Sequence, residues 1–384
     1  MHKDYLTMFE DLLNKYNAMG DDELCLCGSG KPFKNCHKLK DIQERVDLYN
    51  LQKEVLKIFT TKTCYFQDEK CSKTKTASHS IPKTSLKTIS KNNHVLRFMS
   101  LNVAELSKLD ALDQMPPTDI GINEVGSFYG FCSHHDNLLF SPIEKECFEP
   151  TPQQDCLLLF RALCKELYTS TGVTKTIPIH HKLIESKGNI EYKHLLNVEN
   201  ILLFLCRHKC IFEMLNDYNQ LVSDIKNKSF NGYSSITIVT EQPLPINCCS
   251  YVNPAFSLDG SVYQDYNDLS VDLESFSFTA FTSGNNGFFH LCWSNKTNFA
   301  KFFSPLFDIK KDQLADFFIQ MVFAYSENHA FNKDWWEGLH IQKRDHLIKI
   351  FFSDIINQPV RSNPVDDFFS MKFSDLNIVD IKKH

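Results

Sequence analysis

Thirteen residues near the start of the chain hold three cysteines and a histidine. The segment CLCGSGKPFKNCH (residues 25–37) contains Cys25, Cys27, Cys36 and His37. Three thiolates and one imidazole form the four-ligand set of tetrahedral zinc, whereas a redox pair would have the spacing C-x-x-C. The glycines between the ligands let the backbone turn tightly, so that its N–H groups face sulfur. We therefore predict a zinc knuckle, and unligated loop cysteines are the alternative.

The knuckle segment closely resembles the SEC-C motif, a small zinc-binding segment at the end of the preprotein-translocase ATPase and in many other bacterial proteins. The resemblance rests on the C-x-C-G-S-G-K opening and the C-H close. It implies a bacterial protein in which these four residues hold zinc. It also suggests a protein partner, or a ribosome, for the knuckle. Because all four ligands come from the protein, such a zinc is structural.

A second set of cysteines and histidines lies between residues 64 and 136. CYFQDEKC supplies Cys64 and Cys71, and GFCSHHDNLLF supplies Cys132, His134 and His135. Two cysteines in a turn, followed much later by C-x-x-H at the start of an expected helix, predict a second zinc site. We expect Cys64, Cys71, Cys132 and His135 to be its ligands, with His134 as the alternative to His135. The chain would then bind one or two structural zinc ions.

The arrangement from 60 to 150 looks like a divergent HNH-type treble clef. In that family a strand presents a histidine before I-P, as SHSIP does here, and the second ligand pair opens a helix. The resemblance implies that His79 is the general base and that Asp136 binds a catalytic divalent ion such as Mg²⁺, for phosphodiester hydrolysis. The sequence departs from the family in the spacing C-x6-C and in Ser78, where an acidic residue is common. The interval from His79 to Cys132 is also longer than usual, and no asparagine lies where the family's middle N is expected. A zinc-stapled domain without catalysis is the alternative.

Charge is distributed unevenly around this second set. The whole chain of 384 residues carries a formal net charge of −6, which argues against a grip on nucleic acid by the entire surface. Residues 61–98 are locally basic, whereas residues 101–150 are acidic. The candidates for contacts with nucleic-acid phosphates are Lys73, Lys75, Lys83 and Lys87. In the simpler alternative, the basic and acidic halves neutralise each other.

Hydrophobic periodicity predicts the surrounding elements. Helical spacing covers residues 38–59 and most of 151–228, and again 309–325 and 341–356, whereas residues 61–150 look irregular. Alternation in SSITIVT, SFSFTAFT and NGFFHLCWS predicts strands. We expect a multidomain α+β fold in which zinc-stabilised N-terminal modules precede a larger domain of helices, mainly antiparallel strands, then helices. The expected domains are 1–60 (the knuckle with flanking helices), 61–150 (the HNH-like module) and 151–384.

The C-terminal part offers one further candidate site. Glu327 and His329 lie close to Trp335 and Trp336, so an acid/base pair of a hydrolase is one hypothesis. The alternative is that the tryptophans pack in the core and the polar residues cap a helix. The adjacent cysteines at 248 and 249 are expected to be small buried residues.

Signals for export or membrane insertion are missing from the sequence. The N-terminal segment carries charges throughout and has no signal-peptide core, and the most apolar run is ILLFLC at 201–206. We expect a cytoplasmic protein with reduced thiols and no membrane partner. The first functional hypothesis is a metal-dependent nuclease or nucleic-acid-binding effector, of the phage-defence or toxin kind. The second is a non-catalytic, zinc-scaffolded interaction module or adaptor.

Overall fold

The computed structural model describes most of the chain, in two compact units. The described residues are 11, 14–15, 17–26, 30–36, 38, 48–98, 116–185, 190–265, 268, 270–356 and 371–384. Unit 1 comprises residues 1–61, 167–216 and 265–273, and unit 2 comprises residues 62–166, 217–264 and 274–384. Two long helices, α6 (Pro152–Glu185) and α7 (Ile190–Asn227), contribute residues to both units.

The described part of unit 1 is mainly helical, apart from the segment that contains the knuckle and residues of 265–273. It contains η1 (Phe33–Asn35) and α2 (Leu48–Phe59) together with parts of α6 and α7. The end of α2 packs on α6, where Tyr168 Oη donates to the carbonyl of Phe59 at 2.7 Å. A side chain at Gly172 would lie 2.5 Å from the Phe59 ring, so this approach depends on glycine. In the part of the chain that the structure describes, no helix is both long and apolar enough to cross a membrane.

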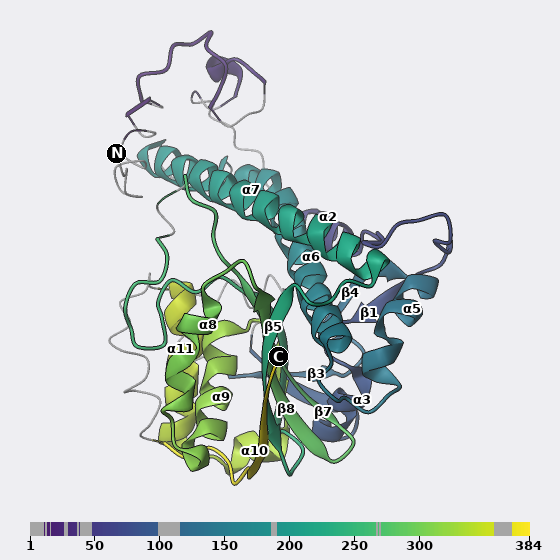
Figure 1. Cartoon of the computed structure of the whole chain (residues 1–384). Helices are drawn as coiled ribbons and strands as arrows, with labels where there is room; N and C mark the ends of the chain where they lie inside the picture. The colour runs from purple at the N-terminus through teal and green to yellow at the C-terminus, as the bar shows by residue number, and fades with distance from the viewer. Residues whose placement is uncertain are drawn as a thin grey trace. The chain divides into compact units, whose positions relative to one another are not determined.

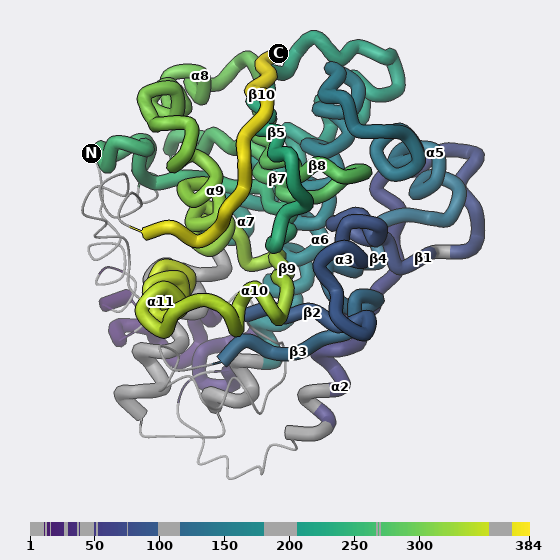
Figure 2. The backbone as a smooth tube through the Cα atoms, turned by 90° about the horizontal axis from the view of Figure 1, so that it is seen from below, coloured from purple at the N-terminus to yellow at the C-terminus, as the bar shows by residue number. Residues whose placement is uncertain are grey.

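Unit 2 is built on an eight-stranded sheet in which every neighbouring pair is antiparallel. The strand order is β10-β5-β8-β7-β6-β9-β2-β3. The strands are β2 (His94–Arg97), β3 (Thr118–Gly121), β5 (Tyr233–Thr240), β6 (Ile246–Val252), β7 (Phe276–Ser283), β8 (Asn286–Ser294), β9 (His329–Phe331) and β10 (Ile378–Lys383). Figure 2 shows β10 beside β5, and β2 and β3 beyond β9. Helices with an antiparallel sheet confirm the predicted α+β class.

One face of the sheet forms the main hydrophobic core. The helices α8 (Phe299–Phe302), α9 (Lys311–Tyr325), α10 (Lys333–Gly338) and α11 (Ile341–Ile356) contribute to it (Figure 1). Alternate residues of β7, Phe276 and Phe278, point into this core and contact aromatic rings of α8 and α9. Each buried phenylalanine contributes roughly 2–3 kcal/mol.

The C-terminal candidate pair belongs largely to this core. His329 is 1% exposed, its Nδ1 lies 2.7 Å from the Ser326 carbonyl, and its Nε2 accepts the Phe98 N–H at 3.5 Å. Burial lowers the pKa of His329 to about 4. Trp336 is buried, and Asn332 caps α10. The packing of both tryptophans in or against the core agrees with the alternative prediction, although Asn332, and neither Glu327 nor His329, caps the helix.

A small second sheet in unit 2 carries the zinc-ligand candidates. It pairs β1 (Lys75–His79) with β4 (Ser127–Cys132), and α5 (Ser133–Glu144) follows at once. Between the two strands the chain forms α3 (Lys83–Ile89) and the strands β2 and β3 of the large sheet. The prediction that residues 61–150 are irregular was wrong, because these strands are too short to show a clear alternation and depend on pairing with distant segments.

Candidate functional site

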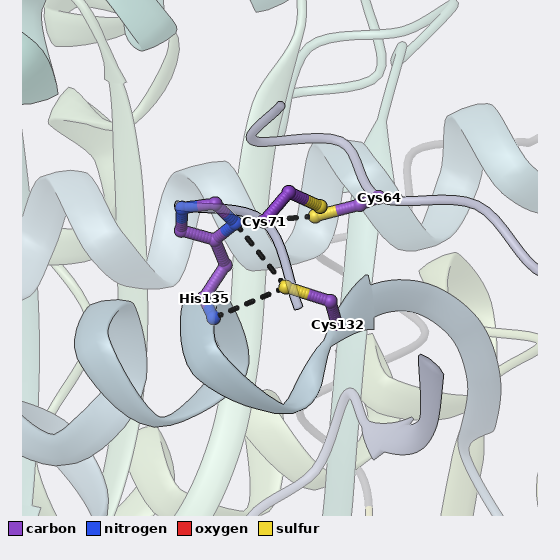
Figure 3. A group of neighbouring side chains, drawn as sticks. All are labelled: Cys64, Cys71, Cys132 and His135. Carbon is purple, nitrogen blue, oxygen red and sulfur yellow. Dashed lines mark hydrogen bonds between the residues drawn. The ribbon is translucent and has the colours of Figure 1, made fainter. Parts of the chain in front are cut away.

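Four of the predicted metal ligands come together in unit 2. The donor atoms of Cys64, Cys71, Cys132 and His135 all lie within 4.8 Å of one another, and their side chains converge in Figure 3. His135 Nδ1 lies 3.4 Å from Cys64 Sγ and 3.3 Å from Cys132 Sγ. The neighbouring His134 is exposed and lies outside the group, so the structure selects His135.

The donor set fits zinc. With usual zinc–sulfur and zinc–nitrogen distances, tetrahedral geometry separates sulfur from nitrogen by roughly 3.6 Å, close to the distances found here. Burial raises the pKa of the Cys132 thiol, but N–H donors of His135 and Ser72 outweigh it and bring that pKa to about 5. Cys132 is therefore poised to ligate as a thiolate. Burial instead raises the pKa of Cys64 to about 11, so binding zinc there would displace a proton.

Backbone pairing positions the first two ligands. The loop before β1 runs along β4: the Thr63 N–H donates to the Tyr129 carbonyl at 2.9 Å, and the Tyr65 N–H donates to the Gly130 carbonyl at 2.8 Å. These two bonds fix Cys64 from either side. A Cβ at Gly130 would lie 2.2 Å from the Phe128 ring, so only glycine fits where the loop meets the strand.

The other two ligands sit at the junction of β4 and α5. Cys132 ends the strand and caps the helix, because its sulfur accepts the N–H of His135 at 3.5 Å. The spacing of three residues places the imidazole in the first helical turn, beside the capping sulfur. The sulfur also accepts the Ser72 N–H at 3.3 Å.

A carboxylate that sequence reasoning missed lies next to the ligand histidine. Asp68 Oδ1 is 3.1 Å from His135 Nε2 and accepts the Lys70 N–H at 2.7 Å. Carboxylates in this position orient metal-bound histidines. In the sequence, the feature that could have indicated Asp68 is its position in the loop between Cys64 and Cys71.

His79 lies at the other end of the small sheet from the zinc ligands. In the register of β1 and β4, His79 pairs with Ser127, whereas Cys132 pairs with Lys75. His79 Nε2 is buried and has no hydrogen-bond partner among the described residues. Burial and the nearby Lys83 lower the pKa of His79, so the imidazole is neutral near pH 7. The charged side chains that act most strongly on this pKa are Lys83, Glu144, Arg161 and Asp136.

One stripe of α5 carries two carboxylates that act on this histidine. Asp136, Phe140 and Glu144 recur every four residues and so share one face of the helix. The guanidinium of Arg161, from α6, lies 4.0 Å from the centre of the Phe140 ring, and its Nη2 donates to Glu144 Oε1 at 2.6 Å. The sequence analysis missed Glu144 and Arg161. The signal for Arg161 was a lone cation within the apolar run LLLFRALC.

The predicted nucleic-acid contacts lie on unit 2. Lys83 and Lys87 are exposed, one turn apart on α3, and Lys73 is exposed just before β1. Lys75 is the first residue of β1. Contact between these lysines and nucleic-acid phosphates remains a prediction.

The knuckle of unit 1 is described in part. Cys25 is buried and its N–H donates to the Lys31 carbonyl at 2.9 Å, while the Cys36 N–H donates to the Phe33 carbonyl at 3.0 Å. Leu24 forms a bridge with Pro32. Cys27 and His37 lie outside the described residues, so their part in the four-ligand set remains a prediction.

Comparison with known proteins bears on this knuckle alone. The comparisons with curated proteins and with solved structures found no match to the chain. A family model described as the SEC-C motif matches residues 23–38. Together with the group of three cysteines and a histidine, this match indicates zinc binding. The similarity to the SEC-C motif thus covers residues 23–38 of this chain.

Proposed function

We propose that this protein is a zinc-stabilised, metal-dependent nuclease of the HNH treble-clef type. The order of parts in unit 2 carries this proposal. A loop with two cysteines leads into β1, which ends on His79, and β4 leads to Cys132 and His135 at the start of α5. This is the family's order of ligands, histidine and helix. Such an activity would suit an effector of phage defence or a toxin.

The long interval between the two strands is compatible with this proposal. Residues 80–126 do not separate β1 from β4, since the strands pair directly from Lys75↔Cys132 to His79↔Ser127. The interval instead forms α3, β2 and β3, and both strands join the large sheet. The unusual length therefore adds structure beside the zinc module and leaves its strand–strand–helix core in place.

Each residue of the proposed site has a distinct role. His79 is neutral because its pKa is lowered, so it can accept a proton from water. Asp136, half-buried in the first turn of α5, would hold a divalent ion such as Mg²⁺. That ion would supply charge stabilisation at the phosphate and the leaving oxygen. Zinc would be structural, because four protein ligands fill its shell. Lys73, Lys75, Lys83 and Lys87 would contact further phosphates.

A nuclease assay with added Mg²⁺, Mn²⁺ or Ni²⁺ tests the proposal. We expect His79→Ala to lower the rate by roughly 10²–10⁴-fold, the usual contribution of a general base, and Asp136→Ala to abolish metal-dependent cleavage. His134→Ala is the matched control, because it removes an exposed imidazole next to the zinc ligand. Equal activity in all variants, or no activity in the wild type with any metal, would contradict a nuclease site at His79 and Asp136.

The pH profile gives a second test of the base. Because the pKa of His79 is lowered from its usual 6.5, kcat/KM should rise with pH through an apparent value below 6.5 and then level off. An acid limb centred above 6.5 would contradict the assignment of His79.

An adaptor role remains a second candidate, favoured by one observation on the knuckle. Leu24 is 67% exposed and Leu26 is 36% exposed, although both are apolar. The pair would contact a protein partner or a ribosome through the SEC-C motif. Ribosome co-sedimentation and cross-linking, comparing the wild type with the double variant Leu24→Ser and Leu26→Ser, test this. Binding equal in both proteins would exclude this surface as the contact.

A further inference from the structure

Arg161 has buried hydrogen-bond donors that lack acceptors. Its side chain is 1% exposed, and one donor, Nη2, is used by Glu144 at 2.6 Å. Its Nε and Nη1 are buried and have no partner among the described residues. Guanidinium stays charged at all accessible pH values, and an unpaired buried donor on a charged group is costly. These donors therefore call for an anion. From them we propose that Arg161 is a binding site for a phosphate group.

Two contacts from α5 hold this guanidinium in place. Its face lies against the Phe140 ring at 4.0 Å, and its Nη2 is bound to Glu144 one turn further along the helix. A guanidinium fixed on its face and at one nitrogen loses little further freedom when it binds an oxyanion. This is the preorganisation expected of a binding residue.

The neighbourhood of Arg161 also suits an anion. His79 Nε2 is a second buried polar atom without a partner, and the charge of Arg161 acts on this histidine. Lys83 also acts on this histidine as a cation, opposed by the carboxylates of Glu144 and Asp136. The proposal rests on the proposed function in taking phosphate as the anion, but phosphate binding itself needs no catalysis.

Phosphate could reach this site as a nucleic-acid backbone or as a free or nucleotide phosphate. Calorimetric titration in Mg²⁺-containing buffer separates these sources with three probes: inorganic phosphate, a 5′-mononucleotide and a short DNA duplex. Sodium chloride at equal ionic strength controls for screening. Preference for the duplex identifies a backbone site, and preference for either small probe identifies a free-phosphate site.

The decisive variant is Arg161→Gln, which removes the charge but keeps a hydrogen-bonding side chain. We expect it to weaken phosphate binding by about 10–100-fold, the range for hydrogen bonds to charged groups. Arg97→Gln on β2 is the matched control, because it makes the same change at a half-buried arginine whose Nε already donates to a carbonyl, that of Phe98. Arg161→Lys keeps a charge in the core. This variant should fold, and it should bind phosphate more weakly than the wild type does. It therefore keeps the proposal testable if Arg161→Gln unfolds.

Two results would overturn the proposal. One is a wild type that binds none of the three probes. The other is equal affinity in the wild type, the Arg161 variants and Arg97→Gln. The nuclease assay distinguishes failure of the phosphate-site proposal from failure of the proposed nuclease function. Phosphate binding without hydrolysis would contradict the nuclease alone, whereas hydrolysis without Arg161-dependent binding would contradict the phosphate site alone.

Discussion

The knuckle at 25–37 and the cluster at 64–135 offer the same donors but assemble them in opposite ways. The knuckle collects its predicted ligands from one short turn. The cluster takes two from a loop and two from a strand–helix junction that is distant in the sequence. A local site can form before the rest of the chain folds, whereas a distributed site needs the strand pairing that joins its halves. Zinc in the cluster should therefore stabilise tertiary structure, and zinc in the knuckle only a turn.

Loss of a ligand should show this contrast most strongly. Cys132→Ser should remove one zinc and lower the free energy of unfolding of unit 2 by several kcal/mol. That loss is a fraction of the roughly 10–16 kcal/mol that zinc supplies to zinc fingers. Cys25→Ser should also remove one zinc but leave the unfolding of unit 2 nearly unchanged. Metal analysis and thermal unfolding measure both. Equal destabilisation of unit 2 by the two variants would contradict the claim that only zinc in the cluster stabilises tertiary structure.

A methyl group on β4 should disturb only the distributed site. Gly130→Ala would place a carbon 2.2 Å from the Phe128 ring, so we expect destabilisation of about 3 kcal/mol, the upper end for overpacking. Zinc affinity should fall with it, since this strand aligns the Cys64 loop. Gly338→Ala is the control, because an added Cβ there meets nothing within 4 Å. Denaturant unfolding measures the free energy of unfolding of both variants. Equal losses in the two would contradict a special role for Gly130.

Asp68 should tune the cluster without creating it. Asp68→Asn keeps the shape of the side chain but removes the charge beside His135 Nε2. We expect zinc affinity at this site to fall by roughly 10-fold or more, as is usual for such partners of metal-bound histidine. Competition with a chromophoric chelator measures the change. Asp119→Asn is the control. It makes the same change at an exposed carboxylate of β3 and should leave zinc affinity unaltered.

The smallest effect is expected at the surface of the knuckle. Lys34 pairs with Asp22, and both side chains are substantially exposed. Lys34→Ala should cost less than about 1 kcal/mol, because solvent screens exposed ion pairs. Zinc content should remain that of the wild type. A large loss of zinc would show that the charge of this lysine matters to the thiolates.

The sequence identified the metal-binding candidates better than the elements around them. Cysteine and histidine are rare enough, and their spacing regular enough, that the set at 64, 71, 132 and 135 was predicted from residue type. The longer helices, α2, α6, α7, α9 and α11, and the three longest strands followed from periodicity. The short strands β2, β3 and β9 did not, because four or fewer residues carry too little pattern and their place depends on distant partners.

Residue types and their spacing therefore identified the chemistry: a resemblance to the SEC-C motif, a second thiolate–imidazole set and an α+β composition. Tertiary structure decided which histidine joins the cluster, that Asp68 stands behind it, and that Arg161 meets Glu144 and Phe140. It also buried His329, a candidate acid/base residue, in the core. The reason is physical. Ligand types are properties of single residues, whereas burial and partnership arise only when segments far apart in the chain pack together.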